Sequence, residues 1–598
     1  YYIYLLLISM NNNNSIIKQK QYLLLILLTL ANIISVCLET IGISMLPALL
    51  IAIVFPDATE LNNYIINYSK IINLENENFI LYFSGVILVF FIFKNFFFIF
   101  VKWLESITYK IINLFISGNL FRGYINLSYS RHQLNNPSML LRNMTSECEN
   151  FTTYIISLIN ILREFLLVVF LFSLLFIQNK EMSVVIFSSL FFISGIFYFF
   201  IRKNVFNRGQ LTQNLRGQQL KLITEALGSI KFIKLLNKEN EFSQKFKNNL
   251  ENILSQNVFL GLLQVFPKLF LELFAVICLL SATVYFVNYS SSSNDLIPFL
   301  SLLGIILIRL IPSFNNMSTA LSLVKYHSVS HKLLLKEFKK FNKPKYKNIA
   351  IKNNFTGDVF KKRLFLDNLS YSYPLTNKKV LKNISINLEP NTSIAIIGPT
   401  GSGKSTLIDL ILGLLEPTKG KILIDNTSIK KKIRSWQSII GYIPQDIYLG
   451  DESIEKNISF EQDENKIDSK HLKKIIKLCL LDKLINSLPK KEKTNIGNRG
   501  VRLSGGQIQR IGIARCLYRN PEVIIMDEAT SSLDYKSEKE IIKSINNFKK
   551  GRTFITIAHR LSTIKNSDKI YILKDGKIVD SGKYNYLKKR HKDFFLNT

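Results

Sequence analysis

The sequence is poor in the residues that hold metal ions or cross-link small secreted proteins. Its 598 residues include only five cysteines and six histidines. The cysteines are scattered, without a CxxC pair and without metal-ligand spacing, so buried apolar side chains are the better interpretation. We therefore expect neither a disulfide framework nor a cysteine metal site. The cysteines are Cys37, Cys148, Cys278, Cys479 and Cys516.

Acidic residues are also scarce, since 43 Asp and Glu stand against 76 Lys and Arg, a formal net charge of +33. Clustered Lys and Arg are typical of nucleic-acid-binding proteins. Here, however, lysine is spread through the chain together with abundant Asn and Ile. A basic cytoplasmic face beside anionic lipid explains the excess better, so we expect a membrane and no nucleic acid as partner.

Long apolar runs are abundant before residue 330, whereas the remainder reads as a soluble α/β protein. A membrane-spanning helix needs about 20 apolar residues. Six segments meet this requirement: 22–55, 79–104, 152–177, 182–202, 258–287 and 296–324. We predict a multidomain chain, with an all-α transmembrane domain of six helices (residues 1–342), a linker (343–362) and a soluble domain (363–598).

The connections between these segments differ in charge. The second and fourth connections are rich in Lys and Arg, and the first, third and fifth have one or none. Under the positive-inside rule, both termini and the soluble domain lie in the cytoplasm of a multi-pass cell-membrane protein. Apolar residues at three- and four-residue spacing over 222–236 predict helical arms in the fourth connection. No cleavable signal peptide is expected, and Tyr1 in place of Met indicates a fragment boundary.

Charged residues inside the predicted spans need partners. Near a helix centre such a residue costs about 2.5–3.5 kcal/mol on the insertion scale, so it should face the bundle interior. Glu39, Glu272 and Arg309 are candidates to line a translocation pathway. An inter-helix salt bridge or a position near the membrane surface explains them equally well. The sequence leaves open which carboxylate pairs with Arg309.

The soluble part contains a glycine-rich loop between an apolar run, Ser393–Ile397, and an amphipathic segment, 407–415. Glycine adopts the positive φ angles that let successive backbone N–H groups converge on a phosphate, and the helix N-terminus favours negative charge. Lys404 would reach the β- and γ-phosphates, and Ser405 would bind Mg²⁺. A ligand-free turn explains any single such match. The loop residues are Gly398, Pro399, Thr400, Gly401, Ser402, Gly403, Lys404, Ser405 and Thr406.

Further motifs follow the loop in an informative order. The buried strand Val523–Asp527 ends in carboxylates, with Asp527 placed to hold Mg²⁺ through water and Glu528 to polarise an attacking water. Gln445 also follows a predicted strand. His559 also ends a strand, where contact with the γ-phosphate is a better interpretation than a structural role.

An aromatic residue precedes the loop by about 25 positions. The stretch 364–374 alternates in polarity, which predicts an antiparallel strand pair, and it ends near Tyr373. Tyr373 is a candidate to stack on adenine, a contact worth about 1–3 kcal/mol in base–aromatic systems. A tyrosine packed in a β-sheet is the competing interpretation.

One more motif, Leu503-Ser-Gly-Gly-Gln507, precedes a predicted helix, 508–518. Together with the phosphate loop, the carboxylate pair and the terminal histidine, it resembles the ATP-binding cassette family, and the six preceding spans resemble a type I exporter half-transporter. The resemblance implies a homodimer with two working ATP sites that hydrolyses ATP with Mg²⁺, and it implies that Gln445 contacts Mg²⁺ and takes part in catalysis. Ser504, Gly505, Gly506 and Gln507 would then close over the partner's nucleotide, and Asp534 would communicate across the interface.

One segment departs from the family pattern. The family's Thr-Glu-Val-Gly-Glu-Arg-Gly is here Thr494-Asn-Ile-Gly-Asn-Arg-Gly500. Asn495 and Asn498 replace two glutamates in a segment that contacts the membrane helices in the family. Coupling contacts there should therefore be neutral hydrogen bonds, while the hydrolysis chemistry is unchanged.

The substrate is predicted from local similarity. The contexts of Glu39, Arg309 and Asn143–Glu147 resemble flippases of lipid-linked oligosaccharides, so an outward-moved lipid-linked or amphipathic substrate is expected. The alternatives are an exporter of hydrophobic peptides, drugs or lipids, and a channel or regulator that carries a cassette without transporting. The intact Glu528 argues against the last.

Overall fold

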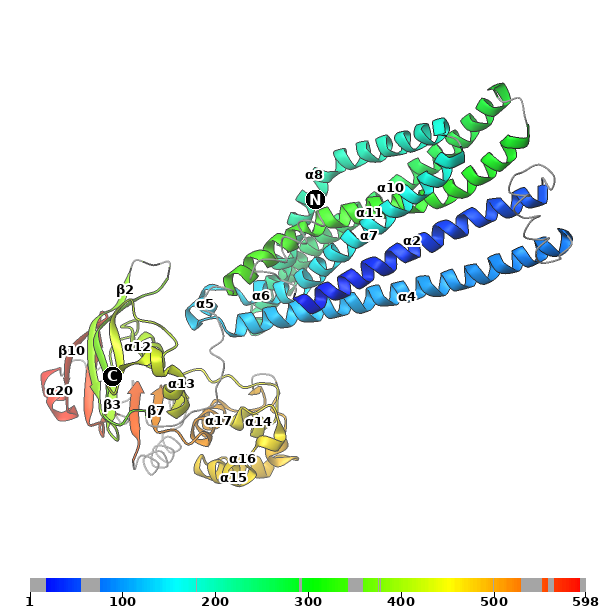
Figure 1. Ribbon diagram of the computed structural model, residues 1–598. Coiled ribbons are helices and arrows are strands. Elements are labelled where there is room, and N and C mark those ends of the chain that lie inside the picture. The colour runs from blue at the N-terminus through cyan, green and yellow to red at the C-terminus, as the bar shows by residue number, and fades with distance from the viewer. Residues whose placement is uncertain are drawn as a thin grey trace. The chain divides into compact units, whose positions relative to one another are not determined.

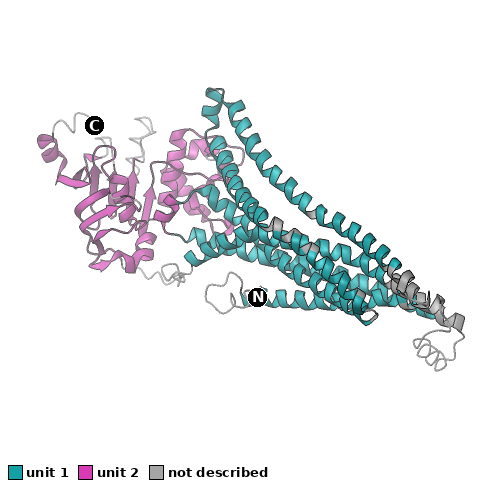
Figure 2. Cartoon of the chain, turned by 90° about the horizontal axis from the view of Figure 1, so that it is seen from above, with its two compact units in different colours: residues 1–127, 135–348 teal, residues 128–134, 349–598 magenta. Residues whose placement is uncertain are grey.

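The computed structural model consists of two compact units, shown in teal and magenta in Figure 2. One unit contains residues 1–127 and 135–348, and the other contains residues 128–134 and 349–598. The structure describes residues 18–54, 76–178, 180–289, 293–341, 359–374, 376, 378–497, 500–528, 551–557 and 564–591. The described part of the second unit's main segment therefore begins at Val359, within the predicted linker.

The first unit is built from long helices (Figure 1). Each predicted apolar segment lies in one of them, apart from residue 55, which is outside the described residues. The helices are α2 (Gln19–Val54), α4 (Asn76–Ile125), α7 (Ser146–Gln178), α8 (Lys180–Gly228), α10 (Glu239–Tyr289) and α11 (Ser293–Phe341). By length and composition, four stretches of the described residues can cross a membrane: 19–47, 81–125, 137–177 and 239–281. The remaining two predicted spans, within α8 and α11, stay predictions.

Most of these helices are longer than a bilayer needs. Helix α4 has 50 residues, which at 1.5 Å per residue gives about 75 Å, against a hydrocarbon core of about 30 Å. The predicted helical arm over 222–236 is confirmed in part, because α8 continues to Gly228 and the residues beyond it form a separate short helix. Between α4 and α7 lie α5 (Tyr129–Leu134) and α6 (Pro137–Met144). Between α8 and α10 lies α9 (Ile230–Leu235), after a break at Ser229 within the arm.

Large aliphatic side chains fill the core between the helices of the first unit. Helix α11 packs against α7, α8 and α10, and α2 packs against α4 and α7. Leu28, Leu167 and Leu303 are fully buried between them. Apolar side chains also cover outer surfaces; Ile308 is 74% exposed and Leu81 71%. In a water-soluble protein such surfaces would be unfavourable, so they are consistent with a lipid environment.

The second unit contains two sheets. The first is antiparallel, in the order β2-β1-β4-β5, formed by β1 (Leu364–Ser372), β2 (Lys379–Leu388), β4 (Lys419–Ile424) and β5 (Thr427–Ser428). The residues 364–372, expected to contain a strand pair, are one strand whose antiparallel partners are β2 and β4. The prediction of a strand pair within this stretch is wrong, because the chain makes no turn between Leu364 and Ser372. The strands that pair with β1 come from later segments.

The second sheet positions the functional residues. Its order is β10-β9-β3-β8-β7-β6, with β3, β6, β7, β8 and β9 parallel and β10 antiparallel at the edge. These strands are β3 (Ser393–Ile397), β6 (Ile440–Ile443), β7 (Val523–Asp527), β8 (Thr553–Ile557), β9 (Lys569–Lys574) and β10 (Lys577–Gly582). Because parallel strands end at one edge, ligands of open α/β sheets bind beyond their carboxyl ends.

Figure 1 labels the helices that lie between residues 404 and 590. They are α12 (Lys404–Ile411), α13 (Ile429–Ile439), α14 (Ile454–Ser459), α15 (Ser469–Leu478), α16 (Asp482–Ser487), α17 (Gly505–Tyr518) and α20 (Tyr584–Arg590), with the short 3-10 turns η2 (Glu464–Lys466) and η3 (Lys491–Lys493). One apolar cluster, which includes the fully buried Trp436, joins both sheets, and a second joins α14–α17 to β6 and β7.

Candidate functional site

The glycine-rich loop joins β3 to α12, as the sequence predicts. Gly401 and Gly403 have φ angles of 81° and 102°, which a Cβ would make unfavourable. Gly398 is required for a different reason, because a Cβ there would overlap the carbonyl oxygen of Leu573 in β9. The loop is therefore shaped by close backbone approach at its start and by left-handed backbone at its end.

Lys404 turns back over this loop. Its Nζ donates hydrogen bonds to the carbonyl oxygens of Gly398 (2.7 Å) and Pro399 (3.1 Å). Burial lowers the pKa of Lys404, and the nearby carboxylates of Glu528 and Asp527 oppose this shift. The hydroxyl of Ser402 is buried without a hydrogen-bond partner in the described part of the chain. A buried ammonium and an unused hydroxyl in one loop fit an anionic ligand.

The two carboxylates lie at the end of β7, at the same edge of the sheet. Asp527 is buried and Glu528 is half-buried. Glu528 has a φ of 48°, uncommon outside glycine, and its N–H donates to the Ile557 carbonyl of β8 at 3.1 Å. The Nε2 of Gln445, just beyond β6, donates to Glu528 Oε2 at 2.9 Å. The structure thus brings Gln445 to the carboxylate pair Asp527 and Glu528, which follows it by about 80 positions.

Tyr373 lies next to the helix that follows the loop. Its hydroxyl shares a hydrogen bond of 3.0 Å with Thr406 Oγ1, and its ring makes an edge contact with Tyr371 at 5.1 Å between centroids. The structure therefore places Tyr373 beside the loop, and adenine stacking stays a prediction.

Ser504 forms the N-cap of α17, so this helix begins at Gly505, earlier than predicted. Ser504 Oγ accepts from the Gln507 N–H at 3.3 Å, and the Ser504 N–H donates to Gln507 Oε1 at 2.8 Å. This reciprocal capping box holds the two glycines of the motif in the first turn of the helix. The N-terminal N–H groups of a helix suit an anionic ligand.

Some predicted residues lie outside the described part of the chain, namely His559, Asp534 and Asn498. Asn495 is described, and its side chain serves its own segment. Its Oδ1 accepts from the Gly497 N–H at 2.7 Å, and its Nδ2 donates to the Asp451 carbonyl at 3.4 Å. Asn495, one of the two residues that differ from the family pattern, therefore has a local structural role.

Sequence reasoning missed Asp409 in α12. Burial raises its pKa to about 6, and the neighbouring charge of Asp527 adds to the shift. The available signal was one acidic residue among the apolar positions of the helix after the loop. Asp409 and Asp527 give this side of the site negative charge, which the Lys404 ammonium partly offsets.

In the first unit, Arg309 of α11 forms an ion pair with Glu39 of α2. This answers which carboxylate Arg309 meets. Glu272 instead pairs with Lys268 of its own helix at 3.6 Å, and its side chain is 47% exposed. The structure therefore assembles two of the three predicted pathway residues.

Other buried charges join helices of this unit. Arg163 Nη2 lies 3.1 Å from Glu164 Oε1 within α7, and Asn316 of α11 donates to the same oxygen at 3.3 Å. Lys94 of α4 is close enough to Glu39 and Arg309 to interact electrostatically with both. The cluster of Glu39, Lys94 and Arg309 thus carries two cations and one carboxylate.

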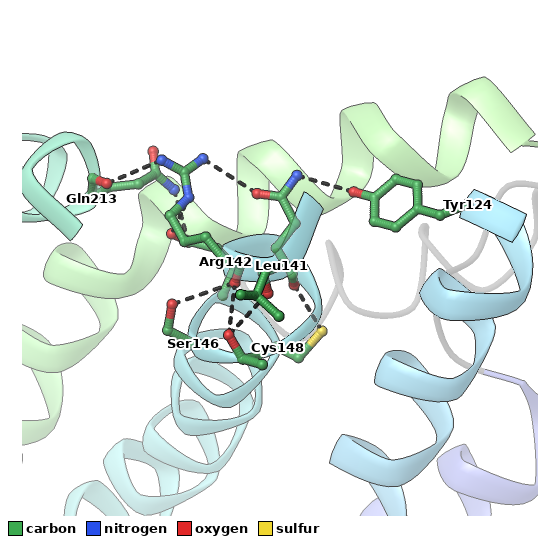
Figure 3. A network of polar contacts seen from close by, with 9 residues as sticks. Tyr124, Leu141, Arg142, Ser146, Cys148 and Gln213 are labelled. Atoms are coloured by element: carbon green, nitrogen blue, oxygen red, sulfur yellow. Dashed lines mark hydrogen bonds and ion pairs between the residues drawn. The ribbon is translucent and has the colours of Figure 1, made fainter. Parts of the chain in front are cut away.

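A third polar group surrounds Arg142 of α6 (Figure 3). Its guanidinium donates to the Gln213 carbonyl of α8 at 3.0 Å and to Asn143 Oδ1 at 3.2 Å, and it pairs with Glu147 of α7 at 3.4 Å. Asn143 Nδ2 then donates to the Tyr124 hydroxyl of α4 at 3.0 Å. The segment Asn143–Glu147, singled out from sequence, therefore belongs to a buried network that connects helices.

Comparison with known proteins identifies both parts of the chain. Residues 20–310 match the family model of the ABC transporter transmembrane region, and residues 381–531 match the ABC transporter model. A solved structure of a bacterial Atm1-family ABC exporter with ATP bound covers 97% of this chain and 98% of its own, with a TM-score of 0.77 and 20% identity. This confirms the predicted fold class.

Two relatives illustrate the range of similarity. An ATP-dependent lipid A-core flippase from Wigglesworthia glossinidia brevipalpis is 30% identical over 502 residues, 82% of each chain. A multidrug resistance ABC transporter ATP-binding and permease protein from Lactococcus lactis is 31% identical over 376 residues, and the match spans 62% of each chain. The chain thus covers about three fifths of the length of this second relative. With its helical membrane region, phosphate loop and carboxylate pair on one polypeptide, the chain belongs to the ABC transporter family.

Proposed function

We propose that this chain is one half of an exporter that uses ATP hydrolysis to move a lipid-linked or amphipathic substrate outward. The observation that carries the proposal is the convergence of the Lys404 loop, Asp527, Glu528 and Gln445 at one edge of a parallel sheet. These are the groups that phosphoryl transfer needs: a phosphate cradle, a metal-holding carboxylate and a group that orients water.

The residues present fit ATP and Mg²⁺. Lys404 and the loop N–H groups would hold the phosphates, while Ser405, Gln445 and Asp527 would hold the metal ion. ATP would supply the transferable phosphoryl group, and Mg²⁺ would neutralise charge that develops on it. Glu528 would orient and polarise the attacking water. His559 keeps its proposed contact with the γ-phosphate, and Tyr373 its contact with adenine.

A second copy would complete the site. In this proposal Ser504–Gln507 of one chain close over the nucleotide of the other, and Asp534 acts across the interface. The motifs of the ATP site are all present, which supports a homodimer with two working sites; they are the phosphate loop, Ser504–Gln507, Asp527, Glu528 and His559. The ATP-binding units would face the cytoplasm of the cell membrane, and closure of the dimer would shift the membrane helices between inward- and outward-open states because ATP binds the closed state more tightly.

The charge of the membrane cluster supports an anionic substrate. Glu39 and Arg309 neutralise each other, and Lys94 leaves one positive charge among these three residues. In a low-dielectric environment such a charge favours a phosphate or diphosphate group. We propose a lipid-linked oligosaccharide or polysaccharide precursor, and the similarity to a lipid A-core flippase supports the wider class of lipids with charged, sugar-bearing headgroups.

The test is the ATPase activity of purified protein in lipid nanodiscs with added substrates. We expect stimulation by polyprenyl-diphosphate sugars and less stimulation by an uncharged analogue with the same chain. Lys94→Gln and Arg309→Gln should remove the stimulation while ATP affinity stays within about twofold. Lys102→Gln is the matched control, because Lys102 lies on the same helix but pairs with Glu105 at 2.7 Å. Equal stimulation by the uncharged analogue would contradict the proposed substrate class.

A second candidate is export of hydrophobic drugs or peptides, which the similarity to a Lactococcus multidrug resistance protein favours. Such substrates are commonly neutral or cationic. If they stimulate ATP hydrolysis and diphosphate lipids do not, this candidate replaces the first. A cassette-bearing channel or regulator is the least supported function, and measurable ATP turnover would argue against it.

A further inference from the structure

The segment that follows Gln445 is held on α17 by one arginine. Arg515 Nε donates to the Asn457 carbonyl at 2.7 Å, its Nη1 donates to the Tyr448 carbonyl at 2.9 Å, and its Nη2 lies 3.4 Å from Asn457 Oδ1. A guanidinium can satisfy several acceptors at once because its donors form a rigid planar fork. Arg515 therefore ties both ends of residues 448–457 to the same turn of α17.

Asn457 organises the same segment from within. It is 4% exposed, and its Oδ1 accepts from the Gly450 N–H at 2.9 Å. Its Nδ2 donates to the carbonyls of Gly450 and Ser453, both at 3.1 Å. Asn457 thus closes residues 450–453 into a compact loop. Arg515 holds the residues on both sides of this loop and therefore fixes the whole segment.

A second, apolar contact fixes the start of the segment. Ile447 packs on α17 at Gly512, where a Cβ would overlap the end of the Ile447 side chain and lie 2.8 Å from its Cγ1. Glycine in a helix interior costs about 1 kcal/mol relative to alanine. Here it makes room for Ile447. The segment is therefore held on α17 at Ile447, Tyr448 and Asn457.

Ile447 and Tyr448 lie two and three residues after Gln445, a distance of at most about 10 Å along the chain. We propose that Arg515 is a positioning residue for ATP hydrolysis, which holds residues 447–457 on α17 and thereby holds the Gln445 amide at the Glu528 carboxylate. Since α17 begins with the Ser504–Gln507 motif, Arg515 also joins that motif to the carboxylate edge of the sheet. This inference rests on the proposed ATP hydrolysis.

The test is a kinetic comparison on the full-length protein in nanodiscs with Mg-ATP. Arg515→Ala should lower kcat about tenfold or more, because small misplacements of a catalytic group have effects of that size. KM for ATP should stay within about twofold, since the Lys404 loop keeps its contacts. Arg510→Ala is the matched control: Arg510 lies on the same helix and donates to the Leu480 carbonyl at 3.0 Å. It should leave kcat within about twofold.

A double-mutant cycle separates positioning from simple stabilisation. If Arg515 acts through Gln445, adding Arg515→Ala to Gln445→Ala should lower kcat by less than about a further twofold. Gly512→Ala provides a variant that retains every charge and raises helix propensity. It should still lower kcat, because Ile447 must move. Should Arg515→Ala fail to fold, Gly512→Ala alone and in the Gln445→Ala background gives the same test.

Full multiplication of the two effects in the cycle would overturn the inference, as would an equal loss of kcat in Arg510→Ala. Normal turnover in Arg515→Ala, beside an active wild type, would also overturn it and leave the proposed function intact. A folded wild type without any Mg-ATP turnover would overturn the proposed function first, and this inference with it.

Discussion

The side-chain amide of Gln445 donates a hydrogen bond of 2.9 Å to the carboxylate of Glu528. The amide follows β6 and the carboxylate follows β7, and these strands are neighbours in the parallel sheet. The bond therefore connects the group that we propose to orient water with a group that we propose to contact the metal ion.

We predict that Glu528→Gln binds ATP with near-normal affinity but lowers kcat at least about a hundredfold, because a general base contributes about 10²–10⁴. The amide keeps the size of the side chain and its bond to Gln445, so folding should be unaffected. The variant should accumulate as a closed dimer in ATP, measurable by cross-linking or by size-exclusion chromatography of the nucleotide-trapped form. Turnover near the wild-type rate would show that Glu528 lacks this role.

The phosphate loop offers a graded pair of glycine substitutions. Gly398→Ala should abolish ATP binding and destabilise the domain by about 1–3 kcal/mol, because the new Cβ overlaps the backbone of Leu573. In Gly401→Ala the new Cβ meets no atom within 4 Å. The only expected cost is the strain of a φ of 81°, about 1–2 kcal/mol. Fluorescent-nucleotide titration and thermal unfolding would check this order, and a more severe effect from Gly401→Ala would contradict the loop geometry.

The network in Figure 3 predicts that Arg142 is important for stability. Arg142→Ala leaves Glu147, which is 1% exposed, without its cation. Breaking a buried pair in this way costs about 3–5 kcal/mol. Gly217→Ala should act in the same direction, because its Cβ would lie 2.8 Å from the Arg142 Nη1.

Ser138→Ala is the control for this network, since it removes only a 2.9 Å bond to Thr224 between α6 and α8. Its expected cost is about 1 kcal/mol. Thermal unfolding of the three variants in detergent would rank them. Equal melting temperatures for Arg142→Ala and Ser138→Ala would mean that the Arg142–Glu147 pair contributes little.

His327 of α11, just beyond the predicted span 296–324, predicts a pH dependence of stability. Burial, and next the charge of Arg216, lower its pKa to about 4. The unfolded histidine binds a proton below about pH 6.5, whereas the folded one does not until about pH 4. Stability should therefore be complete above pH 6.5 and fall as the pH decreases toward 4.

At pH 5 we expect a loss of about 1–2 kcal/mol from this residue. His327→Gln keeps a polar side chain that does not titrate, so its melting temperature should fall less than that of the wild type between pH 7.5 and pH 5. Parallel slopes for the two proteins would show that His327 does not titrate as described.

Local patterns were enough to predict many elements of this protein. The run Ser393–Ile397 is β3, and Val523–Asp527 is β7, because a five-residue apolar run rich in β-branched residues is typical of a buried strand and too short for a helix. The long apolar segments predicted helices, since their backbone polar groups must be paired within the segment. The phosphate loop, too, is a local structure, and its glycines and Lys404 identified it.

Other features depend on segments that are distant in the sequence. Periodicity did not reveal that Arg309 would pair with Glu39 rather than Glu272, because the choice depends on how α2 and α11 pack. For the same reason Asn143–Glu147, which looked substrate-related, is part of a buried network. Tyr373 likewise has a hydroxyl bonded to Thr406, a contact across two elements.

Family, fold class and the types of residue at the ATP site follow from composition, period and motif, all of which act over a few residues. Other features follow only from the folded chain. They are the choice of partner among buried charges, the contact of Gln445 with Glu528, and the hydrogen bonds by which Arg515 holds residues 447–457. Burial strengthens charge and hydrogen-bond interactions only between groups that packing brings together. Such pairings are properties of the assembled helices and sheets, which no local pattern of the sequence specifies.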